Sequence, residues 1–175
     1  MPRTPALPED FLESLLASYA VNECMNQILI DHLDARVWRA KLPGYESRTI
    51  AAIFAHMHNI RRKWMRLSAP HLQLPAELDG LRSTPKHTQR ALAKSAALCG
   101  RLLEQALHTG RGQKFHRDGW ATAWTPDAAM FAYMIAHDAH HRGQVCMLAH
   151  QLGHPLPAKV TSQMWNWERL RKKWA

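Results

Sequence analysis

Two histidines, His137 and His141, are four residues apart in the run His137-Asp-Ala-His-His141-Arg-Gly-Gln144. On an α-helix this spacing places both side chains on one face, close enough to share a metal ion. Neutral imidazole suits zinc, nickel, copper and iron. An HxxxH pair is not specific by itself, particularly in a chain with 12 histidines, so the neighbouring residues must decide whether the pair is a metal site.

The position of each histidine around the predicted helix separates the inward ones from the outward one. With Met134 at the centre of the apolar face and a rotation of about 100° per residue, His141 lies within about 40° of that centre. His137 lies about 60° to one side, still inward, whereas His140 lies about 120° away and is expected to face solvent. Imidazoles on an apolar face need a partner, and a shared metal ion is one way to satisfy His137 and His141.

A third ligand is expected from another helix, and His56 and His58 are its two candidates. Both lie at the edges of the apolar face of their helix, on opposite sides, and the wheel prefers His56 only modestly. Three protein ligands leave one coordination position open, which is the pattern of catalytic rather than structural zinc.

The hydrophobic periodicity is helical throughout, with apolar residues three and four apart and no clean alternation. We expect an all-α four-helix bundle with a short C-terminal helix. Bundle cores commonly hold metal ions between facing helices. Ser47 is the expected N-cap of the second helix, and Thr125-Pro126-Asp127 the start of the fourth. The expected helices span residues 8–35, 47–67, 86–108, 125–152 and 161–174.

The chain of 175 residues has the length of a single domain, with a bundle core over about 8–153 and a C-terminal extension over 154–175. The start of the chain lacks a signal-peptide profile, and no stretch is apolar enough to span a bilayer, so we expect a cytoplasmic protein without membrane contact. Cys24, Cys99 and Cys146 have no paired spacing and no visible activating partner, which indicates reduced, chemically quiet thiols.

The net charge of +9 is spread over the chain, which favours a solvated basic surface. Nucleic-acid binding is disfavoured because no known motif is present and aromatic residues are not interleaved with the charges.

Two stretches resemble the DinB/YfiT-like family of metal-dependent bundle proteins. Residues 47–64 look like the second helix of that family, with a single ligand histidine, here His56, before a tryptophan. The run from His137 to Gln144 is close to the HExxHRGQ-like run of its last bundle helix, and Asn22 stands where the family often has asparagine. Asp138 departs from the more usual glutamate, which keeps the charge but shortens the reach of the side chain. The match covers about 19–153, and the tail from Thr161 lies outside it.

The resemblance implies an up-down-down-up bundle that is often a homodimer. It also implies a divalent metal ion, commonly zinc or nickel, on His56, His137 and His141. Some relatives are thiol transferases or isomerases that use bacillithiol, mycothiol or glutathione, so a low-molecular-weight thiol is an expected second cofactor, and a small-molecule thiol or electrophile an expected partner.

Two function hypotheses follow. In the first, the chain is a metal-dependent thiol transferase or related enzyme, in which the metal lowers the pKa of a bound thiol, or of a bound water for hydrolysis. Arg142 or Arg61 would then pair with a cofactor carboxylate, although a solvated or helix-capping arginine is the simpler expectation for each. Asp138 and Gln144 are the candidates for supporting the ligands. In the second hypothesis, the chain is a non-enzymatic metal-binding stress-response protein with a structural metal.

Overall fold

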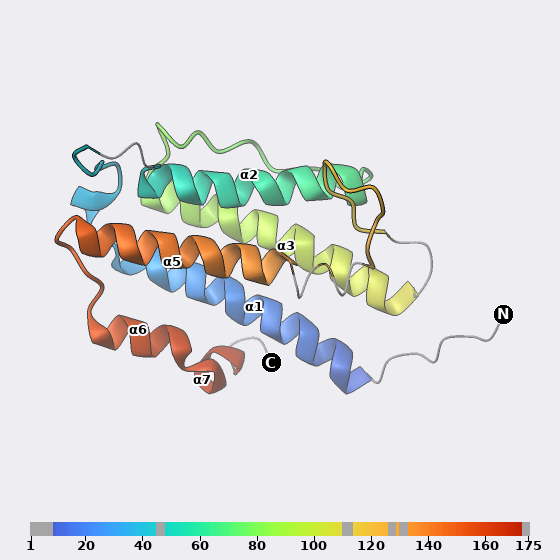
Figure 1. Ribbon diagram of the computed structural model, residues 1–175. Helices are drawn as coiled ribbons and strands as arrows, with labels where there is room; N and C mark the ends of the chain where they lie inside the picture. The colour runs from blue at the N-terminus through green and yellow to red at the C-terminus, as the bar shows by residue number, and fades with distance from the viewer. Residues whose placement is uncertain (1–8, 45–47, 110–113, 126–128, 130–132, 173–175) are drawn as a thin grey trace.

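The computed structural model describes residues 9–44, 48–109, 114–125, 129 and 133–172 (Figure 1). Over these residues the fold is all-α, as the periodicity predicts. The long helices are α1 (Glu9–His32), α2 (Ile50–Ser68), α3 (Pro85–Thr109) and α5 (Ile135–Gln151). The short ones are the 3₁₀ helix η1 (Ala35–Val37), α6 (Ala158–Trp165) and α7 (Trp167–Arg171). Within the described ranges, the β-type pairing is an isolated bridge between Phe115 and Trp124.

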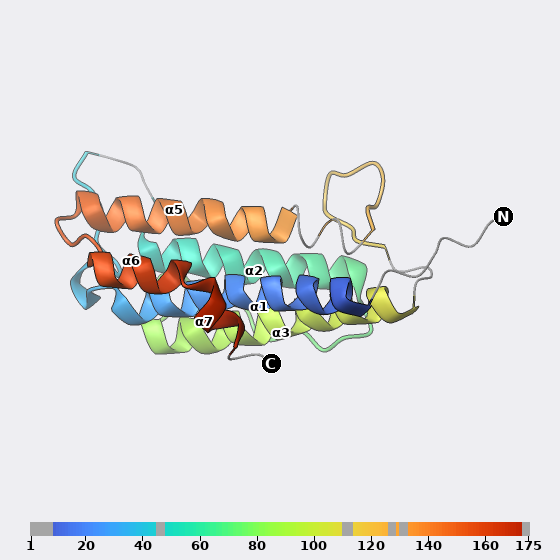
Figure 2. The same ribbon diagram turned by 90° about the horizontal axis from the view of Figure 1, so that it is seen from below.

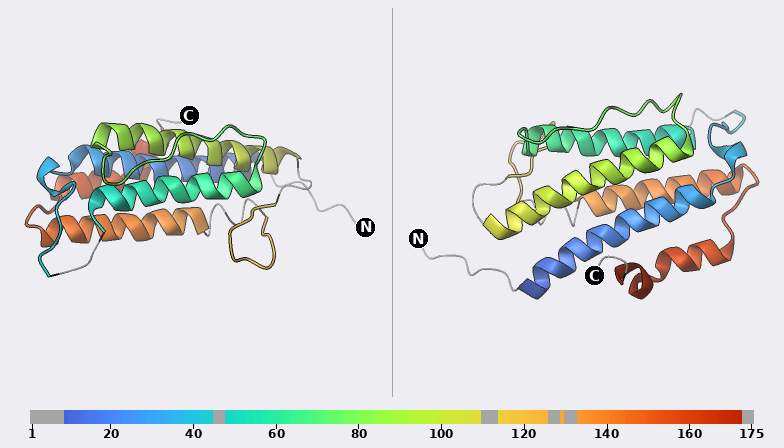
Figure 3. Two further views of the ribbon diagram at one scale, coloured as in Figure 1. Left: turned by 90° about the horizontal axis from the view of Figure 1, so that it is seen from above. Right: turned by 180° about the vertical axis from the view of Figure 1, so that it is seen from behind.

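The long helices form a bundle in which α1 and α5 run one way and α2 and α3 run the other (Figure 1). This is the up-down-down-up order that the family resemblance implies. Helix α2 packs against both α3 and α5, and α1 also packs against both of them. Because α2 and α3 are parallel, the segment between them must return along the whole length of the bundle, as Figure 3 shows.

The start of α2 differs by a few residues from the sequence-based prediction. Ser47, the predicted N-cap, lies outside the described residues. Thr49 is the cap: its backbone is extended, and its Oγ1 accepts a hydrogen bond from the Ala52 N–H at 3.2 Å. A capped first turn fixes where α2 begins and therefore the direction in which its side chains point.

The first helix is shorter than predicted. Helix α1 ends at His32, and Asp34 then caps η1 by accepting from the Arg36 N–H at 2.8 Å. Of the predicted start of the fourth helix, Pro126 and Asp127 lie outside the described residues, while Ala129 is helical and its N–H donates to the Thr125 carbonyl at 3.0 Å. Tyr133 and Met134 are in a π-helical turn, and the regular helix α5 begins at Ile135.

The C-terminal helix was predicted as one element over 161–174, and this is wrong in two respects. Helix α6 begins earlier, at Ala158 directly after Pro157, a residue that fits a helix start because it has no N–H to leave unpaired. The helix then breaks at Asn166, whose side chain accepts from the Arg169 N–H and so starts α7. The predicted end at Trp174 lies outside the described residues.

The extension packs on the bundle rather than projecting from it. Figure 2 shows α6 and α7 along α1, and both helices contact it. Met164 and Leu170 are buried in the same apolar cluster as Leu29 of α1 and Phe54 of α2. None of the described helices combines the length and apolarity needed to cross a bilayer.

The return segment between α2 and α3 is held along α2 by hydrogen bonds. The Asn59 side chain donates to the Leu78 carbonyl at 2.9 Å and accepts from the Leu78 N–H at 3.0 Å. At Gly80 the segment touches α2 so closely that an added Cβ would lie 2.8 Å from the Cα of Ala52. Glycine is therefore required here by close approach of two backbones.

This contact predicts that two glycine-to-alanine substitutions change the free energy of unfolding in opposite directions. Gly80→Ala should destabilise the protein by about 1–3 kcal/mol because the new methyl group meets backbone. Gly100→Ala, within α3 and with nothing within 4 Å of its added Cβ, should stabilise the protein by about 0.5–1 kcal/mol. Urea unfolding measures both changes. Equal effects at the two positions would show that the close approach at Gly80 is not a constraint.

Candidate metal centre

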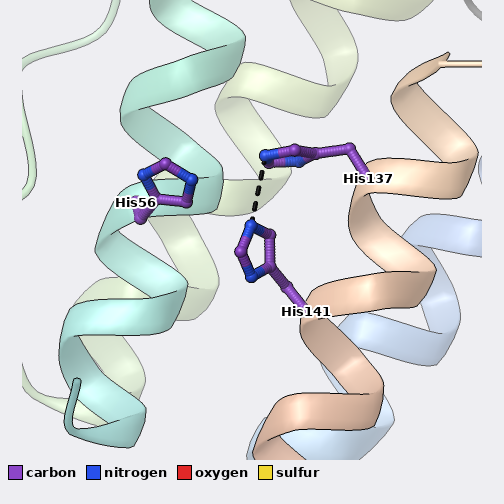
Figure 4. A group of neighbouring side chains, drawn as sticks. All are labelled: His56, His137 and His141. Carbon is purple, nitrogen blue, oxygen red and sulfur yellow. Dashed lines mark hydrogen bonds between the residues drawn. The ribbon is translucent and has the colours of Figure 1, made fainter. Parts of the chain in front are cut away.

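The structure brings three predicted histidines together. His137 and His141 project from successive turns of α5 toward His56 on α2 (Figure 4). One ring nitrogen from each histidine lies within 4.8 Å of one nitrogen from each of the other two, and the Nε2 atoms of His137 and His141 are 3.2 Å apart. Two nitrogens on one tetrahedral zinc ion would be separated by about 3.3 Å, given Zn–N bonds of about 2.0–2.1 Å. The donor set therefore fits a single divalent ion.

The electrostatics of the cluster favour the neutral, ligating form of imidazole. Burial, together with the nearby Arg48 guanidinium, lowers the pKa of His56 from 6.5 to about 4. Burial also lowers the pKa of His141. Because a metal ion binds the unprotonated imidazole, these two side chains need no proton release to accept an ion at neutral pH.

Gln144 orients His141. Its Oε1 lies 2.7 Å from Nδ1 of His141, and since an amide oxygen only accepts, the proton must be on Nδ1. The lone pair of His141 is then on Nε2, the atom that faces His137. This is the usual way in which a neighbouring acceptor fixes the tautomer of a ligating histidine.

The other candidate histidines have different roles. His58 has no solvent exposure; its Nδ1 lies 3.1 Å from Ser95 Oγ and its Nε2 3.0 Å from the Ala76 carbonyl oxygen. Both ring nitrogens are thus occupied in joining α2 to α3 and to the return segment. His140 is exposed, as the helical wheel predicts, with its ring edge-on to His141 at 5.0 Å between centroids. The choice between His56 and His58 is therefore settled in favour of His56 as the member of the cluster.

A buried ion cluster lies beneath the histidines. Arg61 and Asp138 are both fully buried and form an ion pair, and Arg61 also contacts Glu23 Oε2 at 2.8 Å. Asn22 donates to Asp138 Oδ2 at 2.7 Å. Burial alone would raise the pKa of Asp138, but Arg61 and Arg142 outweigh it and hold that pKa well below its ordinary range.

Arg61 and Arg142 do not have the roles that the sequence suggested. Arg61 is entirely buried, so it neither meets a cofactor carboxylate nor lies in solvent. Arg142 is half-buried and donates to Asn22 Oδ1 at 2.6 Å and to Asn26 Oδ1 at 2.9 Å. Both guanidiniums join α1 to the ligand-bearing helices. The sequence interpretation missed that Arg61 faces the bundle core. Its position five residues after His56 on the same helix was the available signal.

Asp138 also lies next to the candidate ligand His137. Its Oδ1 is 3.9 Å from Nδ1 of His137, and among the described residues neither atom has a hydrogen-bond partner. The carboxylate is thus an acceptor within a small ring movement of His137. Although aspartate is shorter than the glutamate more usual at this position, its carboxylate is held by Arg61 and Asn22.

The two ends of the histidine cluster differ. At one end Trp64, only 1 % exposed, packs edge-on to His137 with ring centroids 5.3 Å apart. Phe115, Trp120 and Tyr133 extend this aromatic group. At the other end His141 lines an open cavity of about 860 Å³ between α2 and α5.

The cysteines play no visible part in the site. Burial raises the pKa of Cys99 to about 12 and also raises that of Cys146. Both thiols are therefore protonated at neutral pH and poorly suited to attack an electrophile or to ligate metal. This agrees with the expectation that they are chemically quiet.

An up-down-down-up bundle with three histidines converging from its second and last long helices defines a class of candidate metal-binding proteins. The sequence matches the DinB family over residues 9–169, and the chain belongs to that family. The match extends through α6 and reaches into α7, beyond the limit of about residue 153 expected from the motifs. Comparison with curated proteins and with solved structures gives no match.

Removing the charge of Asp138 should be strongly destabilising. Asp138→Asn leaves the buried Arg61 with one carboxylate partner instead of two, and we expect a loss of about 3 kcal/mol in the free energy of unfolding. The matched control is Glu168→Gln, which breaks the exposed pair with Lys172 and should change stability little. Urea unfolding distinguishes the two. Equal, small effects would mean that the ion cluster does not hold the bundle together.

The lowered pKa of His56 predicts that the free energy of unfolding of the metal-free protein depends on pH. The unfolded chain takes up this proton near pH 6.5 and the folded chain only near pH 4, so protonation favours unfolding as the pH falls through this window. His56→Gln should make the loss of stability between these pH values shallower. Urea unfolding in chelator, at several pH values across the window, is the measurement. An unchanged slope in the variant would contradict the assignment.

Proposed function

We propose that this chain is a metal-dependent enzyme that holds zinc or nickel on His56, His137 and His141 and acts on a small-molecule thiol or electrophile. The observation that carries the proposal is the convergence of three imidazoles beside an open cavity. A tetrahedral ion with three protein ligands keeps one position for a substrate atom.

The chemistry follows from this open position. A divalent ion held by His56, His137 and His141 would supply Lewis-acid chemistry that lowers the pKa of a thiol or of water. Gln144 keeps His141 in the tautomer that can ligate, and the Arg61–Asp138 pair fixes the helix turn that carries His137. Trp64 excludes water from the closed end of the cluster. Thiol transfer is preferred because the family resemblance includes thiol transferases.

The alternative is a stress-response protein with a structural metal. The cavity argues against it, since structural zinc is usually closed by four protein ligands and no carboxylate or thiol among the described residues completes this group. The homodimer implied by the resemblance stays a prediction.

Metal content tests the first half of the proposal. Protein purified without a nickel column should hold close to one divalent ion per chain by elemental analysis. His56→Ala, His137→Ala and His141→Ala should each lose most of it, since each removes one of three ligands. His140→Ala, a change at an exposed histidine next to the site, should keep it. Metal-free wild-type protein after metal supplementation would refute the proposal.

Turnover tests the second half. Thiol conjugation of a small electrophile, measured with bacillithiol, mycothiol and glutathione in turn, should be lost on treatment with chelator and restored by zinc or nickel. Activity that is absent with every thiol, in protein shown to hold metal on the three histidines, would favour the structural alternative.

A further inference from the structure

The cavity beside His141 has two kinds of wall. The apolar part consists of Leu42, Ile53, Met147 and Leu148. Ile53 is one helical turn before His56 on α2, so this wall begins directly next to the histidine cluster. Met147, near the C-terminal end of the bundle helix α5, is 59 % exposed. A flexible, polarizable side chain left uncovered at a cavity is suited to contact an aliphatic group of a ligand.

The polar part of the wall carries positive charge and hydrogen-bond donors. Arg48 is an exposed guanidinium at the rim, and no acidic residue lines the cavity. Arg48 and His141 line the same cavity, so the guanidinium and the histidine cluster face one space. Because Oε1 of Gln144 already accepts from His141, the group that Gln144 has left is its NH₂, a donor.

From these two walls we infer that the cavity binds an aliphatic carboxylate, with the anionic end at Arg48, the chain against Ile53, Met147 and Leu148, and the other end at His141. The inference deepens the proposed function, since it gives the substrate class of the same site: a small organic acid whose thiol or electrophilic carbon lies at the far end of its chain. The guanidinium can pair with the carboxylate through two hydrogen bonds, which a neutral or cationic end group cannot accept in the same way.

The first experiment does not depend on metal. Metal-free protein with ¹³C-labelled methionine methyl groups is titrated with hexanoate and with hexan-1-ol, and the Met147 signal, assigned from Met147→Leu, is followed by NMR. Hexanoate should bind about tenfold more tightly than the alcohol, the ratio expected for one partly exposed charge-assisted pair. Arg48→Gln should lose this preference, and Arg48→Lys should restore part of it.

Arg101→Gln is the matched control, because it removes an exposed arginine from α3, away from the cavity, and should keep the wild-type preference. Arg48 is itself exposed, so its replacement should leave folding intact. Equal binding of acid and alcohol by wild-type protein, or a preference that persists in Arg48→Gln, overturns the inference.

The second experiment connects the cavity to the metal. In cobalt-substituted protein, 6-mercaptohexanoate should give a sulfur-to-cobalt charge-transfer band at a concentration about tenfold lower than 6-mercaptohexan-1-ol, with the same dependence on Arg48. A band at equal concentrations for both thiols overturns the inference while leaving the proposed metal function standing. Failure of cobalt to bind the three histidines defeats the proposed function, and the metal-free titration still decides the carboxylate site.

Discussion

A guanidinium with no solvent exposure is the constraint on which this bundle depends. Arg61 lies in the interior, where an unpaired charge would be very costly, and it is neutralised by Asp138 from α5 and Glu23 from α1. Arg142 and the two asparagines of α1 complete a hydrogen-bonded group that joins all four long helices, because Arg61 also donates to the Leu92 carbonyl of α3 at 3.1 Å. Such a group tolerates little sliding or rotation of one helix against another, because any shift leaves a buried charge unpaired.

This buried group determines where the histidines lie. His137 immediately precedes Asp138, and His56 is a little over one turn before Arg61, so fixing the two charges also fixes the angular positions of the ligands. The remaining freedom is in the rings. Gln144 limits it for His141, and Trp64 limits it for His137 from the closed end of the cluster. Rigid placement of this kind is what lets three imidazoles converge before any ion is present.

Much of this was readable in the sequence, for reasons that individual residues make clear. Helical periodicity places His141 and His137 inward and His140 outward, and the structure agrees because α5 is a regular helix over that stretch. Periodicity does not separate His56 from His58, since both lie at edges of one face. That distinction comes from Ser95 and Ala76, which lie far away in the chain and satisfy His58.

The roles of Arg61 and Asp138 were also beyond the sequence. An arginine on a helix is usually exposed. No residue near Arg61 in the sequence indicates that α1, α3 and α5 all contact its side chain. The cavity is a further case: its walls come from the segment before α2 and from an exposed face of α5, and no motif marks residues that are brought together only by packing. Helix boundaries shifted wherever a nearby cap competed, as at Thr49 and Asn166.

The separation of ligands from the groups that hold them has a consequence for redesign. The three histidines contribute little to the ion cluster, and the ion cluster contributes no atom to the triad of ring nitrogens. The three candidate ligand positions can therefore be substituted without changing how the helices pack against one another. Cysteine or aspartate at positions 56, 137 or 141 would change the hardness and charge offered to an ion without asking the helices to find a new arrangement. A library confined to these three positions and to Gln144 would vary metal preference on a fixed backbone.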